Sequence, residues 1–454
     1  MKKVTLTLIL VFLICIDIYS QALARKGWLG AKVENVNDSI ATVLKLPQNK
    51  GVNITQVVGG TSQKLGLKVN DVITAIGNQP VTNLVELSKV LSQLTENQSV
   101  IFQLIRDGKP IQLKGKVVGR ARESSKTVEV IYESVPYKEG KLSAIISKPK
   151  KSGKLPAVLF VPGYTCSSID NLPDYHPYKR IIDAYTDGGY VVMRIEKSGL
   201  GDSQKTPDCS TTTLLDEVES FGLGLQKLMS LSYVDSSNVF IFGHSMGGIV
   251  APALSAKTKV KGVIVYGTTA KSWFEYQLEM NRLQLKLAKV EPLEYEQNCR
   301  LQAEIAYEYF ILNKSLSDIA KDKEKAEALK RDWQFDGNNM IFDRNQEYWR
   351  QIQNYPLLEN WKQTTSHVLV LYGQADFQAF SKPDHEQIVD TVNFFHPNQA
   401  TLIEFPETDH YFSKSGSMQN AFDLFNAGKY AELFENFNVE VTQKTIDWSN
   451  QLIK

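Results

Sequence analysis

Residues 239–250 read VFIFGHSMGGIV. An apolar run leads directly into Gly243, and small residues that suit a closely packed helix follow from 247 to 256. This order of strand, sharp turn and helix places Ser245 on the turn, where its hydroxyl is exposed. Glycines on both sides of Ser245 permit a close backbone approach that a Cβ atom would prevent. The pattern therefore predicts a reactive serine at the end of a buried strand.

Apolar strands alternate with helix-length segments on both sides of this stretch. The expected strands are residues 156–161, 190–195, 239–242, 260–266, 368–372 and 401–405. Such strands are buried on both faces, so the alternation predicts an α/β fold with a mainly parallel sheet and helices on both faces. Between about 271 and 365 a long helical stretch replaces the alternation. It predicts a helical cap inserted above the carboxyl ends of the strands.

A nucleophilic serine needs a histidine to accept its proton and a carboxylate to orient that histidine. Both are expected after the serine, near the ends of later strands. Of the six histidines, His410 lies just beyond the last expected strand, and Asp376 follows the strand before it. Asp409 is adjacent to His410, and adjacent side chains diverge, so Asp409 and Glu407 are weaker candidates. The predicted triad is Ser245, Asp376 and His410.

A tetrahedral intermediate also needs backbone N–H donors for its oxyanion. Met246, directly after the nucleophile, is expected to supply one. The other is expected in the loop after the strand that ends at 161, where Gly163 fixes the turn. Tyr164 is the first choice there and Thr165 the second. No metal or cofactor is predicted, because the sequence has no Cys-x-x-Cys and no pair of histidines at helical spacing.

A different pattern runs from residue 26 to 120. Short strands at 27–33, 51–57 and 71–77 precede a helix at 83–94, and a hairpin turns at Asp107-Gly108. With 454 residues the chain is too long for one hydrophobic core. We therefore expect a small β-rich domain over 26–120, followed by the α/β domain over 121–454.

The first of these domains resembles a bacterial PDZ domain of the kind attached to envelope proteases. The resemblance depends on WLGA at 28–31, GGTSQKLGL at 59–67 and NDVI at 70–73. It implies that backbone N–H groups of one loop bind the C-terminal carboxylate of a peptide that adds as a strand beside the helix. The residues of that loop are Trp28, Leu29, Gly30 and Ala31. The alternative is that the loop only closes a small barrel, and that the groove binds nothing or the neighbouring domain.

From about residue 128 onward the chain resembles the α/β-hydrolase superfamily of serine hydrolases. The serine turn, GQAD at 373–376 and DHYF at 409–412 carry this resemblance. Two positions depart from it: Pro162 precedes Gly163 where many relatives have His-Gly, and Ser198 stands where an arginine is common. The resemblance implies hydrolysis of a carboxylic ester, thioester or amide through an acyl-enzyme, without metal or cofactor.

An esterase acting on a small acyl ester is the leading expectation, because an ester bond demands least of the acid that protonates the leaving group. A serine peptidase or aminopeptidase guided by the PDZ-like domain is the alternative. A second alternative is a non-catalytic protein that binds through that domain, against which the intact serine, aspartate and histidine set argues. A trypsin-like protease is disfavoured, because its catalytic domain would precede the PDZ module and its triad would follow the order His, Asp, Ser.

The first 24 residues have the pattern of a signal peptide. Lys2 and Lys3 precede an apolar run that ends at Ile16, and Ala-Leu-Ala at 22–24 follows. We expect a periplasmic or secreted protein with no stable membrane span after cleavage; an uncleaved anchor is the alternative. With 51 basic and 50 acidic side chains, the net charge of +1 gives no field that would favour nucleic acid.

Export changes what is expected of the cysteines, because thiols outside the cytosol tend to pair. Cys15 belongs to the signal segment, which leaves Cys166, Cys209 and Cys299. A Cys166–Cys209 disulfide is predicted, since both residues lie in loops after strands that end at the same edge of the sheet. The alternative is three free, buried thiols.

Overall fold

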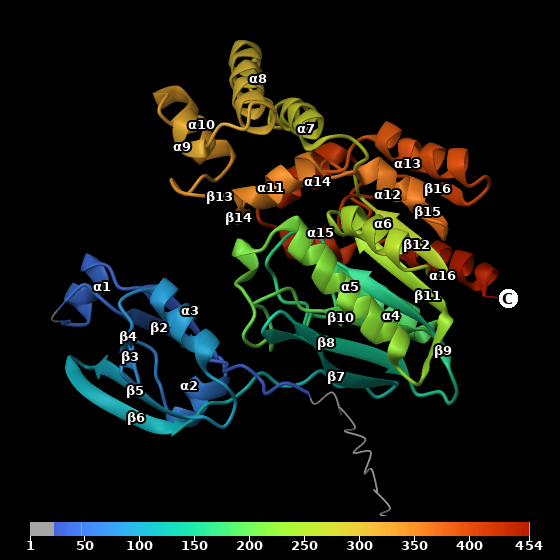
Figure 1. Cartoon of the computed structure of the whole chain (residues 1–454). Helices are drawn as coiled ribbons and strands as arrows, with labels where there is room; N and C mark the ends of the chain where they lie inside the picture. Colours follow the sequence, from blue (N-terminus) through green and yellow to red (C-terminus); the bar gives the residue numbers. More distant parts are fainter. Residues whose placement is uncertain (1–21, 47, 454) are drawn as a thin grey trace, which may run out of the picture.

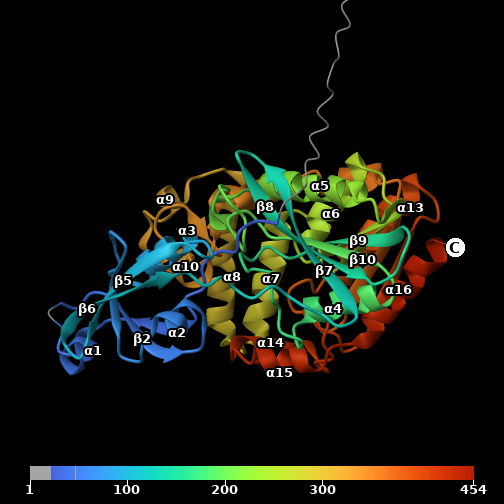
Figure 2. The same cartoon turned by 90° about the horizontal axis from the view of Figure 1, so that it is seen from below.

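The computed structural model describes residues 22–46 and 48–453. They form a β-rich N-terminal domain and a larger α/β domain beside it (Figures 1 and 2). Most of the predicted signal segment, including Cys15, lies outside the described residues. Within the described ranges, no helix combines the length and apolar character needed to cross a membrane.

The N-terminal domain contains one sheet with the strand order β1-β2-β3-β5-β6, and β4 pairs with β3. Asn83 caps α3 by accepting a hydrogen bond from Glu86 N, and Leu87 and Val90 on the buried face of this helix pack into the core. Asp107 (φ 51°) and Gly108 (φ 72°) turn the predicted hairpin in left-handed conformations, which suit the twist of its strands. The elements are β1 (Ala31–Asn35), α1 (Asp38–Val43), β2 (Val52–Val57), α2 (Gly60–Leu65), β3 (Val72–Ile76), β4 (Gln79–Pro80), α3 (Leu84–Gln93), β5 (Ser99–Arg106) and β6 (Lys109–Lys116).

The α/β domain is built on a sheet with the order β16-β15-β12-β11-β9-β10-β8-β7. The six strands from β16 to β10 run parallel, while β8 pairs antiparallel with both β10 and β7. The predicted mainly parallel sheet is confirmed, with an antiparallel hairpin at one edge. The strands are β7 (Val128–Tyr137), β8 (Gly140–Pro149), β9 (Leu155–Val161), β10 (Val191–Ile195), β11 (Val234–His244), β12 (Gly262–Tyr266), β15 (His367–Gly373) and β16 (Ala400–Phe405).

Alternate residues of each central strand pack against opposite layers of helices. In β9, Val158 and Phe160 face α4 (Pro177–Asp187) and α16 (Val439–Leu452). Leu159 and Val161 face the other layer, formed by α5 (Leu214–Ser230), α6 (Gly247–Lys257) and α13 (Lys382–Phe395). Both faces of the sheet are therefore buried, which explains the uninterrupted apolar strands in the sequence.

The helical insertion over residues 273–363 forms a cap: α7 to α10 lie above the α/β domain in Figure 1, whereas its last helix, α12, lies beside α6 and α13 of that domain. Its apolar side chains, Trp273, Tyr309 and Trp333 among them, belong to the same core as the layer of α5 and α6. A strand pair of two residues each interrupts the helices, which the sequence did not predict because so short a pair has no periodic pattern. The elements are α7 (Trp273–Leu287), α8 (Pro292–Ala306), η2 (Tyr307–Ile311), α9 (Leu316–Ile319), α10 (Lys323–Asp332), β13 (Met340–Ile341), β14 (Arg344–Asn345), α11 (Gln346–Gln353) and α12 (Leu357–Gln363).

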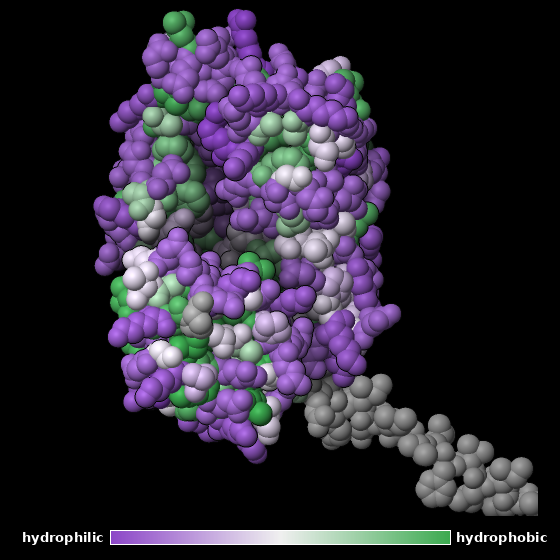
Figure 3. Space-filling model, turned by 90° about the vertical axis from the view of Figure 1, so that its left-hand side faces the viewer, coloured by the Kyte–Doolittle hydropathy of each residue, from purple (hydrophilic) through white to green (hydrophobic). Residues whose placement is uncertain are grey.

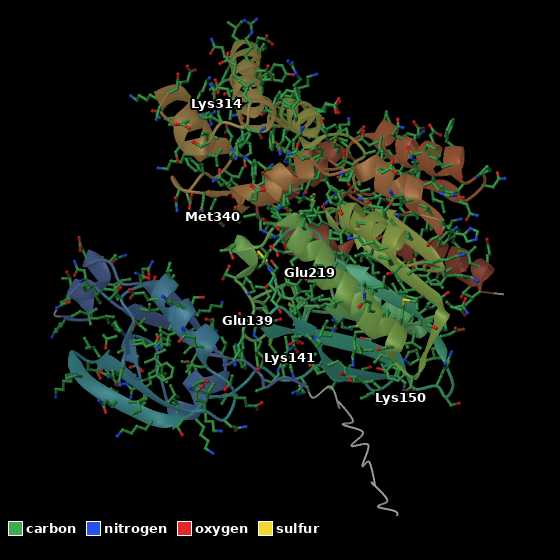
Figure 4. The ribbon with its side chains drawn as sticks, viewed as in Figure 1. Glu139, Lys141, Lys150, Glu219, Lys314 and Met340 are labelled. Atoms are coloured by element: carbon green, nitrogen blue, oxygen red, sulfur yellow. A yellow bond between two sulfur atoms is a disulfide. The ribbon has the colours of Figure 1, made fainter. Side chains whose placement is uncertain are left out.

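Arg25 joins the two domains. Its Nη1 lies 2.5 Å from Asp170 Oδ2 and 2.6 Å from Asp202 Oδ2, and all three side chains are buried. Lys26 adds a hydrogen bond from its backbone N to Asp202 Oδ1 (2.8 Å). Figure 4 shows the turn between β7 and β8, marked by Glu139, on the same side as the N-terminal domain. The junction is therefore a buried ionic contact in which one guanidinium contacts two carboxylates.

Candidate active site

Ser245 follows β11 directly and has a φ of 55°, a left-handed conformation that is strained for a residue with a Cβ. Its backbone N donates to Tyr266 O at 2.9 Å. A Cβ placed on Gly243 would lie 2.4 Å from Gly247 O, and one on Gly247 would lie 2.1 Å from Val161 O. Both glycines are therefore required by close backbone contacts, as the sequence indicated.

His410 and Asp376 are hydrogen-bonded in the interior. His410 Nδ1 lies 2.8 Å from Asp376 Oδ2, and both side chains are almost fully buried. Asp376 Oδ1 accepts hydrogen bonds from Gln378 N (2.8 Å) and Ala379 N (2.7 Å). Each carboxylate oxygen therefore has its own partners, and the side chain cannot turn without losing them.

Asp409 and Glu407, the two weaker candidates for the acid of the triad, have other surroundings. The Asp409 carboxylate accepts from the backbone N of Tyr411 and Ser413 and from the Ser415 hydroxyl, so it closes its own loop. Burial raises the pKa of Asp409 to about 6. Glu407 is exposed. Among the described carboxylates, Asp376 is the one that meets the His410 ring.

His244 connects the loop of His410 to the loop of Gly163. Its Nε2 lies 2.9 Å from His410 O, and its Nδ1 lies 2.7 Å from the Tyr178 hydroxyl. Gly163 N in turn donates to the Tyr178 oxygen at 3.3 Å. A carbonyl only accepts, so Nε2 carries the proton and Nδ1 accepts from Tyr178. Burial lowers the pKa of His244 well below its usual value, in agreement with a neutral ring.

The sequence favoured His410 over the other five histidines as the base, and His244 was set aside because it lies within the serine turn itself; no role was predicted for Tyr178. Tyr178 lies on α4, far from the serine turn in the sequence, and no local pattern marks it.

The candidate oxyanion donors, Tyr164 and Met246, belong to the loop after β9 and to the serine turn. A Cβ on Gly163 would lie 3.2 Å from Ser245 Cβ and 3.5 Å from its Oγ, so the loop after β9 runs directly along the serine. Tyr164 and Met246 line the same cavity as Ser245 and His410. Thr165 is exposed.

This cavity has a volume of about 310 Å³, and seven of the 21 residues that line it are aromatic. A second cavity, of about 420 Å³, shares Gln277, Met280, Gln284, Asp332 and Phe342 with the first. Its other walls are richer in amide and charged side chains, such as Asn281, Asn298 and Arg331. Figure 3 shows the face of the molecule that lies to the left in Figure 1, which is hollowed between the cap and the N-terminal domain. The aromatic residues of the first cavity are Tyr164, Trp273, Tyr276, Phe342, Trp349, Phe377 and Phe425.

A groove of about 500 Å³ lies between β1 and α3 of the N-terminal domain. The loop predicted to bind a carboxylate, Trp28 to Ala31, forms one end of it, and Leu84, Leu87 and Leu91 line one side. Residues 199–202 of the α/β domain close the same end. The neighbouring domain therefore contributes to the groove without filling it.

Cys166 and Cys209 form a disulfide, and Cys299 is a buried free thiol. The disulfide joins the loop after β9, which carries Tyr164, to η1 (Cys209–Thr211).

Removing this disulfide is expected to destabilise the protein by about 4 kcal/mol, because it closes a loop with a sequence separation of 43. The measurement is denaturant unfolding of a Cys166→Ser/Cys209→Ser variant, with and without reductant. Wild type should lose stability in reductant while the double variant does not respond; Cys299→Ser should respond as wild type does. Equal stability of wild type and double variant would contradict the prediction.

The family model described as the alpha/beta hydrolase family matches residues 158–419, which is more than half of the chain. The chain belongs to the α/β-hydrolase family. A second model, described as a PDZ domain, matches residues 27–117. This α/β hydrolase thus carries a PDZ domain ahead of the hydrolase domain, as the sequence predicted.

Curated relatives match only part of this α/β hydrolase. A probable periplasmic serine endoprotease DegP-like of Bartonella henselae is 26% identical over 101 residues, which are 22% of this chain and 20% of that protein. The periplasmic pH-dependent serine endoprotease DegQ of Escherichia coli is 28% identical over 108 residues, 24% of each chain. The chain therefore spans about a fifth to a quarter of the length of these relatives, and the similarity concerns the PDZ domain.

Several solved structures are similar to this α/β hydrolase. Est1E from Butyrivibrio proteoclasticus, with ferulic acid bound, has a TM-score of 0.42 at 16% identity and covers 66% of this chain and 99% of its own. A carboxyl esterase from Bacillus coagulans has a TM-score of 0.43 at 16% identity, covering 73% and 100%. An acylaminoacyl peptidase from Pyrococcus horikoshii has a TM-score of 0.41 at 13% identity, covering 76% and 50%. At these scores none of the three bears on the substrate.

Proposed function

We propose that this α/β hydrolase cleaves carboxylic esters, thioesters included, through an acyl-enzyme formed on Ser245. The observation that carries the proposal is the buried hydrogen bond of 2.8 Å between Asp376 and His410, at the wall of the cavity that Ser245 also lines. A histidine oriented by a carboxylate is what a serine hydroxyl needs to become a nucleophile.

In the proposed reaction, Ser245 Oγ attacks the carbonyl carbon while its proton passes to His410 Nε2. Asp376 holds the imidazole in the tautomer that leaves Nε2 free to accept, and stabilises the imidazolium that forms. The N–H groups of Met246 and Tyr164 donate to the oxyanion. The bond to the leaving oxygen or sulfur then breaks, and His410 returns the proton to it. A water molecule releases the acyl group by the same two steps.

The seven aromatic residues that line the first cavity support an ester with an apolar group next to the scissile bond, since burial of apolar area against them is favourable. A serine peptidase is the second candidate. The amide side chains of the adjoining cavity favour it, because they provide both donors and acceptors for a peptide backbone.

The test is labelling of the folded protein with a fluorophosphonate, followed by kinetics on short p-nitrophenyl esters and on peptide p-nitroanilides. The proposal expects labelling, and a kcat/KM for the best ester well above that for any peptide amide. Faster cleavage of a peptide amide would favour the peptidase. A folded protein that takes no label and cleaves neither substrate would overturn the proposal and leave a binding protein.

For the PDZ domain we propose binding of a peptide C-terminus, with the carboxylate at the Trp28 to Ala31 loop and the chain along β1. We expect a labelled peptide with a free carboxylate to bind at least about tenfold more tightly than its C-terminal amide, because charge-assisted hydrogen bonds to the carboxylate are lost. Fluorescence anisotropy on a peptide library measures this. Leu84→Glu, in the groove, should abolish binding, whereas Val85→Glu, exposed on the same helix, should not. Equal affinity for acid and amide would contradict this mode.

We further propose that the protein is exported. The relatives of the PDZ domain are named as periplasmic proteins, and a disulfide is typical of oxidising compartments. Fusion of residues 1–24 to a reporter that is active only outside the cytoplasm tests this: activity is expected, and a silent fusion that is expressed would refute export by this segment.

A further inference from the structure

Three buried charged side chains lie directly behind the loop that carries Tyr164. They are Lys197, which follows β10, Glu217 on α5 and Arg344 on β14 of the cap. Lys197 Nζ and Arg344 Nη1 each lie 2.8 Å from Glu217 Oε1, and the three side chains are 0–5% exposed. Burial of three charged side chains costs free energy unless each has a specific partner, so the contacts of these side chains indicate what they do.

Both cations of the cluster also hold backbone carbonyls of the candidate oxyanion loop. Lys197 Nζ donates to Gly163 O at 2.6 Å, and Arg344 Nη1 donates to Tyr164 O at 2.6 Å. In a trans peptide the C=O and the N–H that follows it point in opposite directions. A donor fixed on Gly163 O therefore fixes the direction of the Tyr164 N–H, which belongs to the same peptide unit.

We infer that Lys197 and Arg344 are positioning residues of the oxyanion hole, and that Lys197 sets both the direction and the donor strength of the Tyr164 N–H. This inference rests on the proposed function. A cation on a carbonyl oxygen polarises the whole amide, so the N–H at its other side becomes a stronger donor. The cluster holds two cations and one carboxylate, and its excess positive charge lies behind the loop where an oxyanion would form.

Other contacts hold the same loop from several directions. Arg344 Nη2 donates to Thr212 O and Thr212 Oγ1, both at 3.2 Å, just after the disulfide-bonded Cys209. Glu196, next to Lys197, accepts from the Ser168 hydroxyl (2.5 Å) and from Ile169 N (3.3 Å) farther along the loop. Since Arg344 belongs to the cap, displacement of the cap would release Tyr164 O. The loop after β9 is therefore held by three separate parts of the domain. They are the segment after β10, the η1 segment with its disulfide, and the cap.

The charge of Lys197 is also sensitive to pH. Burial lowers the pKa of Lys197 to about 8, and the ion pair with Glu217 opposes this effect. The groups that face the ammonium are Glu217 from α5 and Arg344 from β14, and Tyr348 from α11 contacts Glu217 at 3.3 Å. Lys197 is protonated below this pKa and loses its charge above it. Activity that depends on this cation should therefore fall as the pH rises through about 8.

The experiment compares Lys197→Met and Lys197→Arg with wild type on a short ester, as pH profiles of kcat and KM. In Lys197→Met we expect kcat to fall about tenfold to a hundredfold, less than the loss of a whole oxyanion donor, with little change in KM. The fall in kcat as the pH rises through about 8 should be absent from this variant. Lys197→Arg should recover most of kcat and also lack the decline, because a guanidinium stays charged.

Arg106→Met provides a matched control, because it removes a cation from an ion pair with the buried Asp71 in the PDZ domain. It should leave kcat and the pH profile unchanged, and thermal unfolding should show that all variants are folded. Suppose that wild type is active. If Lys197→Met then keeps the wild-type kcat and the same fall in activity at alkaline pH, the inference is wrong. Failure of the proposed function looks different: wild type itself would take no fluorophosphonate label and cleave no ester.

Discussion

Ser245→Ala should lower kcat for a short ester about a million-fold and abolish fluorophosphonate labelling, because no covalent intermediate can form. Ser245 lies on the strained turn and lines the cavity, and the lack of a Cβ on Gly163 leaves space beside its hydroxyl. The residual rate over water should come from substrate binding and from the N–H donors alone. The measurements are labelling of the purified variant and burst kinetics with a p-nitrophenyl ester.

The matched control is Ser255→Ala, which removes another buried serine hydroxyl from the helix that leaves the turn. Ser255 Oγ contacts Thr364 Oγ1 at 2.8 Å and is not part of the cavity wall. This variant should lose some stability and keep its activity. If Ser245→Ala were still labelled, or still showed a burst, the nucleophile would have to be sought elsewhere.

Asp376→Asn should lower kcat about ten-thousandfold with the fold intact. Two backbone N–H groups donate to Oδ1, so the asparagine oxygen must take that place and its NH₂ must face His410. An NH₂ there donates to Nδ1, which forces the proton of the neutral ring onto Nε2. His410 could then no longer accept the proton of Ser245. The variant therefore tests the tautomer directly, by kinetics and by the ring N–H signals in NMR.

Asp409→Asn is the comparison that distinguishes the two neighbouring acids. The Asp409 carboxylate has its partners within its own loop, so its replacement should cost less than about tenfold in kcat. Should Asp409→Asn prove as damaging as Asp376→Asn, the assignment of Asp376 as the acid would be wrong.

Local sequence patterns predicted the sheet, and they also indicated the candidate serine, aspartate and histidine in their order along the chain. The strands of the α/β domain are apolar because both faces are buried, and strand, turn and helix follow one another around Ser245 within a few residues. His410 and Asp376 each follow a strand, so the parallel sheet brings them to one edge. These positions could be predicted because each residue directly follows a strand that the sequence itself indicates.

The supporting residues could not be predicted, because their roles depend on contacts between distant parts of the chain. Arg344 reaches Tyr164 over a sequence separation of 180, and Tyr178 meets His244 over 66. In the sequence, Lys197 is simply a charged residue that follows the expected strand at 190–195. Nothing local distinguishes such residues from ordinary polar or charged residues; only the folded topology brings them to the loop that carries Gly163 and Tyr164.

The ionic contact of Arg25 has a consequence for the order in which the chain folds. Its carboxylate partners lie 145 and 177 positions later, so they emerge long after the N-terminal domain is complete. Arg25 also donates to the carbonyls of Arg120 and Ala121, at the end of that same domain. Domains generally fold as units. We therefore expect the PDZ domain to close around Arg25 early, and docking of the two domains to be a separate, later step that begins only when Asp202 is in place.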